Sequence, residues 1–112
     1  MIEKILIDYL TPIFPDASVF MEVPKDRPSK FITIERTGGN EAEHIYHSTI
    51  VIDSYDTTLA KTIELNDRVI KAMKNAIQLD EITSCQLNSN YNDTNKETKE
   101  YRYGALFDLT HY

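Results

Sequence analysis

The sequence predicts an α+β fold in which two helices pack on one face of a mainly antiparallel sheet, in the order α-β-β-β-α-β-β. Two segments, residues 2 to 14 and 57 to 77, repeat apolar side chains with a helical period. Five further segments alternate apolar and polar side chains or are rich in β-branched residues, as strands are. Because hairpin turns join most of these strands, antiparallel pairing is favoured.

Length and composition narrow the function classes. The 112 residues predict one domain, residues 1 to 112, and the 41% hydrophobic and 27% charged residues are typical of a globular chain. The net charge of −6 argues against a general nucleic-acid binder, which presents a basic surface to phosphates. The lone Cys85 forms no internal disulfide and predicts a reducing compartment. No apolar run exceeds three residues, which predicts neither a secretory signal nor a membrane span.

The first predicted helix carries one continuous apolar stripe. Its positions are three or four residues apart: Ile2, Ile5, Leu6, Tyr9, Leu10 and Ile13. Pro12 and Pro15 limit the far end of this helix, because proline cannot continue the helical hydrogen bonds. So strong a stripe must lie on another part of the fold.

Three strands follow, at residues 18 to 23, 30 to 37 and 44 to 55. In the second of them, Ile32 and Ile34 share one face of the strand. In the third, the apolar run at residues 50 to 52 predicts burial on both faces of the sheet.

The second predicted helix spans residues 57 to 77, with Asp56 or Thr57 as its cap. Asn66 interrupts its apolar face, whose predicted members are Leu59, Ala60, Ile63, Ile70, Met73, Ala76 and Ile77. Strands at residues 82 to 91 and 101 to 111 close the chain around a polar turn. The aromatic stripe on the last strand is interpreted as core beneath a helix, or else as an exposed face in a subunit contact: Tyr101, Tyr103 and Phe107.

The stretch "FITIERTGGNEAEH", residues 31 to 44, contains the only glycine pair. A phosphate loop would lead into a helix and add Lys with Ser or Thr, whereas this stretch leads into a strand and carries Glu41 and Glu43, which repel phosphate. We therefore interpret it as the tip of a hairpin, longer than a tight turn, that projects as a flexible acidic finger. The predicted assembly-loop residues are Gly38, Gly39, Asn40, Glu41, Ala42 and Glu43.

The sequence predicts no metal site and no cofactor. His44 and His47, with the two glutamates beside them, are the only cluster that resembles a set of metal ligands. Because residues three apart on a strand point to opposite faces, the two imidazoles diverge, and no third ligand is evident.

The sequence also predicts no catalytic residue and therefore no enzyme. His111 completes no Ser–His–Asp set. Asp53 could be a buried acid, but a cap or turn role is favoured. Cys85 is interpreted as a half-buried strand residue rather than a nucleophile.

Two stretches together resemble a known family. "RPSKFITIERTGG", then an acidic loop, then "HSTIVIDSYDTTLAKTIELNDRVIKAM" is similar to the small tail terminator, or tail completion, proteins of long-tailed bacteriophages. The resemblance rests on a strand that ends in an Arg-Thr-Gly-Gly stretch, a longer strand from Ser48 to Tyr55, and a helix with Ala60 near its start. The motif residues are Arg36, Thr37, Gly38 and Gly39. The first helix and the closing "YRYGALFDLT" strand also fit the family's order.

The resemblance implies a virion structural protein without catalysis. Such proteins form a hexameric ring at the head-proximal end of the tail tube, where they end tube growth and join the tail to the head. The implied partners are further copies of the chain, the tail tube protein and the head connector protein, and DNA passes through the channel without specific binding. The implied location is the virion, after synthesis in the host cytoplasm, or the cytoplasm for a prophage-encoded copy. Two alternatives stay open: another phage head–tail connector or minor capsid protein, and a small α+β enzyme or ligand-binding domain.

Overall fold

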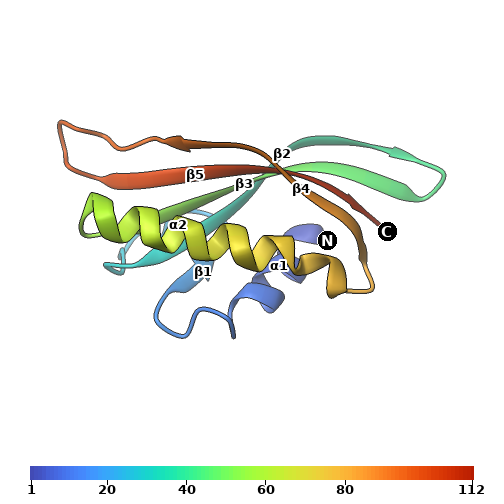
Figure 1. The fold of residues 1–112 in the computed structure, drawn as a ribbon, viewed down its shortest axis with the longest axis horizontal. Coiled ribbons are helices and arrows are strands. Elements are labelled where there is room, and N and C mark those ends of the chain that lie inside the picture. Colours follow the sequence, from blue (N-terminus) through green and yellow to red (C-terminus); the bar gives the residue numbers. More distant parts are fainter.

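The computed structural model describes residues 1 to 112 and consists of a five-stranded sheet with both α-helices on one of its faces (Figure 1). Along the chain the elements are α1 (Ile2–Leu10), β1 (Ser18–Phe20), β2 (Phe31–Ala42), β3 (Ile45–Asp56), α2 (Leu59–Lys74), a 3-10 turn (Ala76–Gln78), β4 (Ile82–Asn92) and β5 (Tyr101–His111). The predicted fold class and element order are confirmed.

The strands lie in the order β1-β2-β3-β5-β4, with β3 at the centre of the sheet. Every pairing among β2, β3, β5 and β4 is antiparallel. β1 adds the single parallel pairing, in which Ser18 to Phe20 lie beside Phe31 to Thr33. This first strand is shorter than the predicted residues 18 to 23, and Pro24, which has no N–H group for a ladder, follows it.

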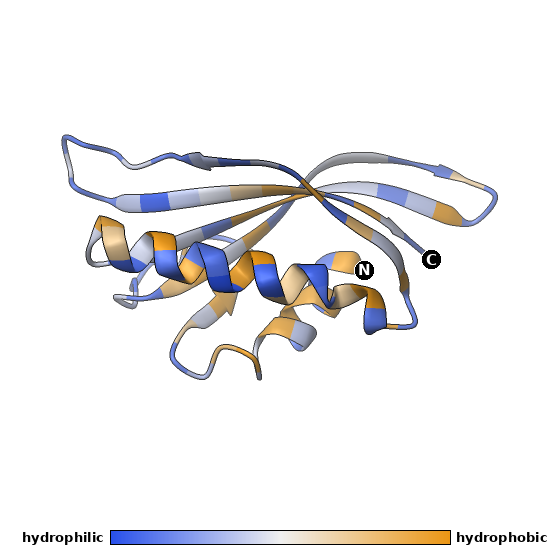
Figure 2. Cartoon of the chain, in the orientation of Figure 1, coloured by the Kyte–Doolittle hydropathy of each residue, from blue (hydrophilic) through white to orange (hydrophobic).

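One cluster of 18 buried apolar residues fills the space between the helices and the sheet, as the orange segments that face each other in Figure 2 indicate. The sheet contributes Ile32, Ile34, Ile50, Ile52, Ile82, Ala105, Phe107 and Leu109. Of the aromatic stripe predicted as core, only Phe107 belongs to this cluster, whereas Tyr101 and Tyr103 are half-buried and lie outside it. Burying each large aliphatic side chain stabilises the fold by about 1.5–3 kcal/mol.

The first helix ends four residues earlier than predicted, at Leu10 rather than residue 14. Its last turn tightens, because the N–H of Ile13 donates to the carbonyl of Leu10 three residues back. This turn carries Ile13 outward, where it is 41% exposed, and brings Phe14 into the core at 1% exposed. The buried stripe of the helix is therefore Ile2, Glu3, Leu6 and Leu10.

The buried face of α2 differs from the predicted face by a rotation about the helix axis. Leu59, Ile63 and Ile77 were predicted to be buried but are exposed. The face that meets the sheet consists of Thr62, Leu65, Asn66, Val69, Ala72 and Met73.

Two polar residues on this face each donate one hydrogen bond, although Asn66 Oδ1 is buried without a partner. Thr62 Oγ1 donates to the carbonyl of Thr58 at 2.7 Å, and Asn66 Nδ2 donates to Asn90 Oδ1 at 2.9 Å. The predicted cap of α2, Asp56 or Thr57, is wrong. The cap is Thr58, whose Oγ1 accepts from the N–H of Lys61.

The apolar run in β3 is not buried on both faces as predicted. Ile50 and Ile52 are fully buried against the helices, whereas Val51 faces the other side of the sheet and is half-buried. The reason is that the helices cover one face only, so the usual alternation of a half-covered antiparallel strand applies.

Candidate functional site

β2 and β3 extend past the part of the sheet that the helices cover, and we call residues 35 to 47 the β2–β3 ribbon (Figure 1). All thirteen of these residues are exposed. β1 pairs with β2 only as far as Thr33, so the outer edge of β2 has no strand beside it from Ile34 to Ala42. β5 accompanies β3 on the other side and ends with His111 opposite Tyr46. The ribbon is thus regular β structure with no core beneath it.

The predicted glycine pair lies within β2 and does not form the end of a loop. The register shifts between Arg36, which pairs with Ile50, and Gly38, which pairs with Thr49, so Thr37 is the extra residue of a bulge. Gly39 has a φ of 156°, and a Cβ on it would lie 2.2 Å from the carbonyl oxygen of His47. No atom lies within 4 Å of a Cβ built on Gly38. Only the second glycine is therefore required by the close approach of the two strands.

The prediction that residues 38 to 43 form a flexible tip longer than a tight turn is wrong. Gly38 to Ala42 pair in the ladder with Ile45 to Thr49, and the connection consists of Glu43 and His44 alone. These two residues have positive φ values of 53° and 68°. A two-residue turn with both φ values positive follows the twist of an antiparallel hairpin, although Asn-Gly suits it better than Glu-His. The glycines follow a bulge inside the strand, and a sequence pattern cannot distinguish this position from the end of a strand.

An exposed apolar pair, Ile45 and Tyr46, lies immediately after the turn, with exposed fractions of 38% and 40%. The ring of Tyr46 stacks on that of His111 at a centroid distance of 5.5 Å. Glu41 is the residue of β2 opposite Tyr46 and raises the pKa of its phenol through a hydrogen bond. The tip therefore combines an aromatic and an aliphatic side chain with carboxylates.

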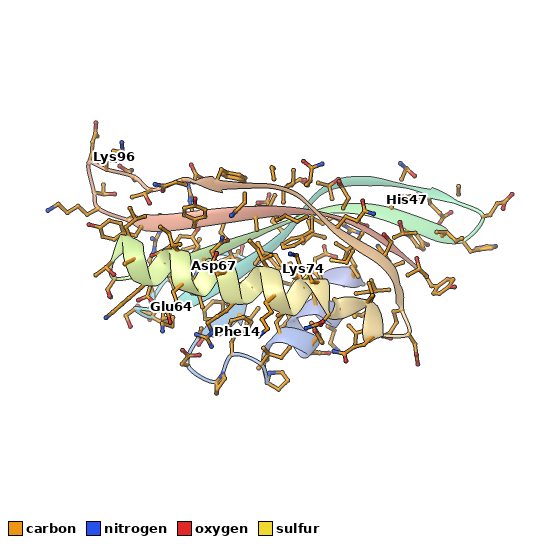
Figure 3. All side chains as sticks on the ribbon, viewed as in Figure 1. Phe14, His47, Glu64, Asp67, Lys74 and Lys96 are labelled. Atoms are coloured by element: carbon orange, nitrogen blue, oxygen red, sulfur yellow. The ribbon has the colours of Figure 1, made fainter.

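His44 and His47 do not come together with other ligands. His44 forms part of the turn, whereas His47 is on β3 (Figure 3), with Nδ1 3.2 Å from Thr110 Oγ1. No group of three His, Cys, Asp or Glu side chains has a geometry that could hold a metal ion.

Sequence reasoning missed a buried pair at the base of the ribbon. Ser48 Oγ and His111 Nε2 are 2.7 Å apart, and both residues are buried. His111 Nδ1 lies 3.2 Å from the main-chain oxygen of Tyr112, which can only accept, so Nδ1 donates there and, in the neutral ring, Nε2 accepts from Ser48. Ser48 pairs with Gly39 on one side and Leu109 on the other. The pair joins the C-terminal strand to β3, and no sequence signal marks it because 63 residues separate its members.

On the helix-free face, Asp53 lies inside β3 between Thr33 and Gly104, so the predicted cap or turn role is wrong. Its Oδ1 atom is buried without a hydrogen bond, close to where the ring of Tyr91 crosses Gly104. Burial raises the pKa of Asp53 to about 6, and Arg102 opposes this rise.

Cys85 is confirmed as a half-buried residue of β4. Burial raises the pKa of its thiol to about 11, so the thiol is protonated at neutral pH.

A groove of about 390 Å³ opens between the end of α1 and the outer side of α2. Its lining is apolar on the α1 side and basic or amide-bearing on the α2 side: Tyr9, Ile13, Phe14, Arg68, Lys71, Ala72, Asn75 and Gln78. Figure 3 shows Phe14 beneath α2 and Lys74 toward the end of that helix. We call this opening the helix groove.

Neither protein-family models nor curated protein sequences give a match to this chain. Neither of its α-helices has the length and apolar character needed to cross a membrane. The candidate functional site is therefore defined by geometry: the β2–β3 ribbon and the helix groove.

Proposed function

We propose that the protein is a structural component of a bacteriophage virion that forms a ring at the head-proximal end of the tail tube, ends tube growth and joins the tail to the head. The family resemblance around Arg36 to Gly39 suggests this role. The observation that supports it best is the β2–β3 ribbon, thirteen consecutive exposed residues of regular β structure.

A sheet that extends beyond its core needs an explanation, because exposed strand edges and uncovered faces are a liability in a free monomer. The ribbon limits this liability with a bulge at Thr37 and charged side chains at Glu35, Arg36 and Glu41. These features oppose edge-to-edge pairing of strands, but the exposed Ile45 and Tyr46 at the tip stay available for a contact. The tip of the ribbon, rather than its strand edge, is therefore the part suited to contact a partner.

The shape of the chain favours a ring over a closed dimer. Its principal extents are 46 by 25 by 25 Å, and the ribbon projects at one end of the long axis (Figure 1). A contact between that end and a different surface of the next copy is heterologous, and repeated heterologous contacts generate rings when the rotation closes.

The net charge of −6 is compatible with a channel for DNA. A ring of acidic subunits repels the phosphate backbone and lets the duplex slide without binding.

The test is a shortened ribbon. Residues 40 to 47 are replaced by Asn-Gly, which joins the paired residues Gly39 and Ser48 through a two-residue turn and keeps the register. We expect the thermal midpoint to fall by no more than about 5 °C, because the removed residues belong to no core and the main loss is the contact of Tyr46 with His111. We expect rings, counted by negative-stain imaging and mass measurement at high concentration or on tail tubes, to be lost.

The control keeps the ribbon and changes only one residue of its turn, with His44→Gly. Normal rings and infectious particles from the shortened chain would contradict the proposal. Rings of another symmetry would favour a different connector component, and a monomer under all conditions would favour the enzyme or ligand-binding class.

A further inference from the structure

Both charged residues that line the helix groove are basic, although the chain as a whole has a net charge of −6. Among its eight lining residues are Arg68 and Lys71 but no carboxylate. Arg68 Nη1 and Nη2 each donate to a carboxylate oxygen of Asp16 at 2.9 Å, so the charge of Arg68 is already neutralised. Lys71 forms no ion pair and is exposed, so the groove presents an unneutralised ammonium group beside an apolar floor.

The tip of the β2–β3 ribbon has the complementary character. Residues 40 to 47 include Glu41 and Glu43 and no lysine or arginine. The same eight residues expose Ile45 and Tyr46. Two apolar side chains near carboxylates therefore lie at one end of the molecule. The helix groove, which contains the unpaired Lys71, lies between the end of α1 and α2.

We propose that the ribbon tip of one copy docks in the helix groove of the next copy, with Ile45 against the exposed Ile13 at the groove wall and with Glu43 beside Lys71. The groove volume of about 390 Å³ lies within the range of about 300–1,000 Å³ of sites that hold small ligands. It is therefore large enough to receive an apolar side chain.

The contact is intermolecular because the ribbon extends along the long axis away from the helices of its own chain (Figure 1). It is also heterologous, since the tip and the groove are different surfaces, and so it propagates from copy to copy. The inference rests on the proposed function for the closed ring, but the docking of tip in groove is a separate claim that the experiments below isolate.

The first experiment exchanges the two charges. Lys71→Glu and Glu43→Lys each place like charges together, and each variant alone should weaken association by about tenfold. The double variant restores the opposite pair and should recover association. Lys61→Glu is the matched control, because it makes the same charge change on α2 outside the groove and should leave association unchanged. Mass measurement over a concentration series gives the readout.

The second experiment captures the contact as a disulfide in a Cys85→Ser background. Chains with Ala42→Cys only are mixed with chains with Asn75→Cys only, and mild oxidation should link one to the other, whereas neither chain should link to itself. A ring that forms without this link, or single charge variants that associate normally, would overturn the docking and leave the proposed ring intact. Linked chains that never close into rings would support the docking and contradict the ring, and chains that never associate would overturn both.

Discussion

Two hairpins project from opposite ends of the sheet, the β2–β3 ribbon and the turn between β4 and β5, and they are held in different ways (Figure 1). The β4–β5 turn is fastened by its own side chains. Asn95 Oδ1 accepts from the N–H groups of Glu97 and Thr98, and Thr94 Oγ1 accepts from the N–H of Arg102. Arg102 also forms an ion pair with Asp93 at 2.7 Å.

The β2–β3 ribbon differs at its turn, although Arg36, Tyr46 and His47 make side-chain contacts farther along the ladder. Its turn residues, Glu43 and His44, have the positive φ values that glycine or asparagine would favour, and neither takes part in a side-chain hydrogen bond. A turn that is completed by its own hydrogen bonds needs no partner, whereas a strained and uncovered tip gains stability from one. The difference teaches that the two hairpins satisfy their turns unequally, and it supports the proposal that the ribbon is the element that contacts a partner.

The largest effect is expected when the ribbon is broken at its tightest point. Gly39→Ala places a Cβ 2.2 Å from the carbonyl oxygen of His47, so the two strands must separate there. We expect ring formation to fall by at least about tenfold and amide protons at residues 40 to 47 to lose protection from exchange. The amides of β3 beside Ile50 and Ile52 should stay protected, because the core is untouched.

Gly38→Ala is the matched control for this prediction, since nothing lies within 4 Å of its added Cβ. Hydrogen exchange and ring counts for the two alanine variants give the comparison. Equal behaviour of both variants would show that the bulge tolerates side chains and that the ribbon is not tightly paired at Gly39.

The fold was predictable because alternation and helical periodicity report which face is buried, and the strands at residues 30 to 37 and 101 to 111 show that alternation clearly. The rotation of α2 was not predictable, because Thr62 and Asn66 are buried only by virtue of partners at Thr58 and Asn90. An apolar stripe drawn from hydrophobicity alone places such residues outside.

The sequence located the ribbon of the candidate site but did not predict its structure. The "RTGG" stretch and the acidic residues after it mark the ribbon, yet glycine fits a bulge and a loop equally well until the register is known. The helix groove has no sequence signal, because α1 and α2 contribute side chains such as Phe14 and Lys71 that only tertiary packing brings together.

The second prediction concerns the pH dependence of stability, which arises at Asp53 of β3 beside Gly104 of β5. The pKa of Asp53 is raised from its ordinary value of 3.8 to about 6 by burial, with Asp93 and Glu35 adding to the rise and Arg102 opposing it. The folded chain therefore holds this proton more tightly than the unfolded chain does. The resulting stability is complete below about pH 4 and is lost as the pH rises through 6.

Asp53→Asn should remove this loss. After allowance for solvent screening, we expect the variant to be more stable than the wild type by about 1–2 kcal/mol at pH 7.5 and nearly equal at pH 4. Urea unfolding at both pH values measures the difference, with the exposed Asp67→Asn as the control. A variant that is less stable at pH 7.5 would show that the carboxylate is satisfied by a partner rather than penalised by burial.

The third prediction tests the side-chain hydrogen bonds that hold the β4–β5 turn. Asn95→Ala removes one oxygen that accepts from two N–H groups, and we expect the free energy of unfolding to fall by about 1 kcal/mol. Lys96, at the same tip in Figure 3, makes no ion pair or side-chain hydrogen bond, so Lys96→Ala should change stability by less than about 0.5 kcal/mol. Ring formation should be unchanged in both variants. A loss of rings with Asn95→Ala would mean that this hairpin, too, contacts a partner.

The smallest effect is expected at the ion pair between Arg27 and Glu100, which ties the turn before β2 to the start of β5. The side chains are 46% and 34% exposed, so water and salt screen the attraction, and holding two long side chains together costs conformational entropy. A double-mutant cycle with Arg27→Ala and Glu100→Ala should give a coupling of about 0.5 kcal/mol or less, and 1 M salt should reduce it toward zero. A coupling well above about 1 kcal/mol that persists in high salt would show that this pair is shielded from solvent. The β4–β5 hairpin would then be anchored to the β1–β2 turn by charge, and not chiefly by the backbone bonds that Asn95 and Thr94 receive.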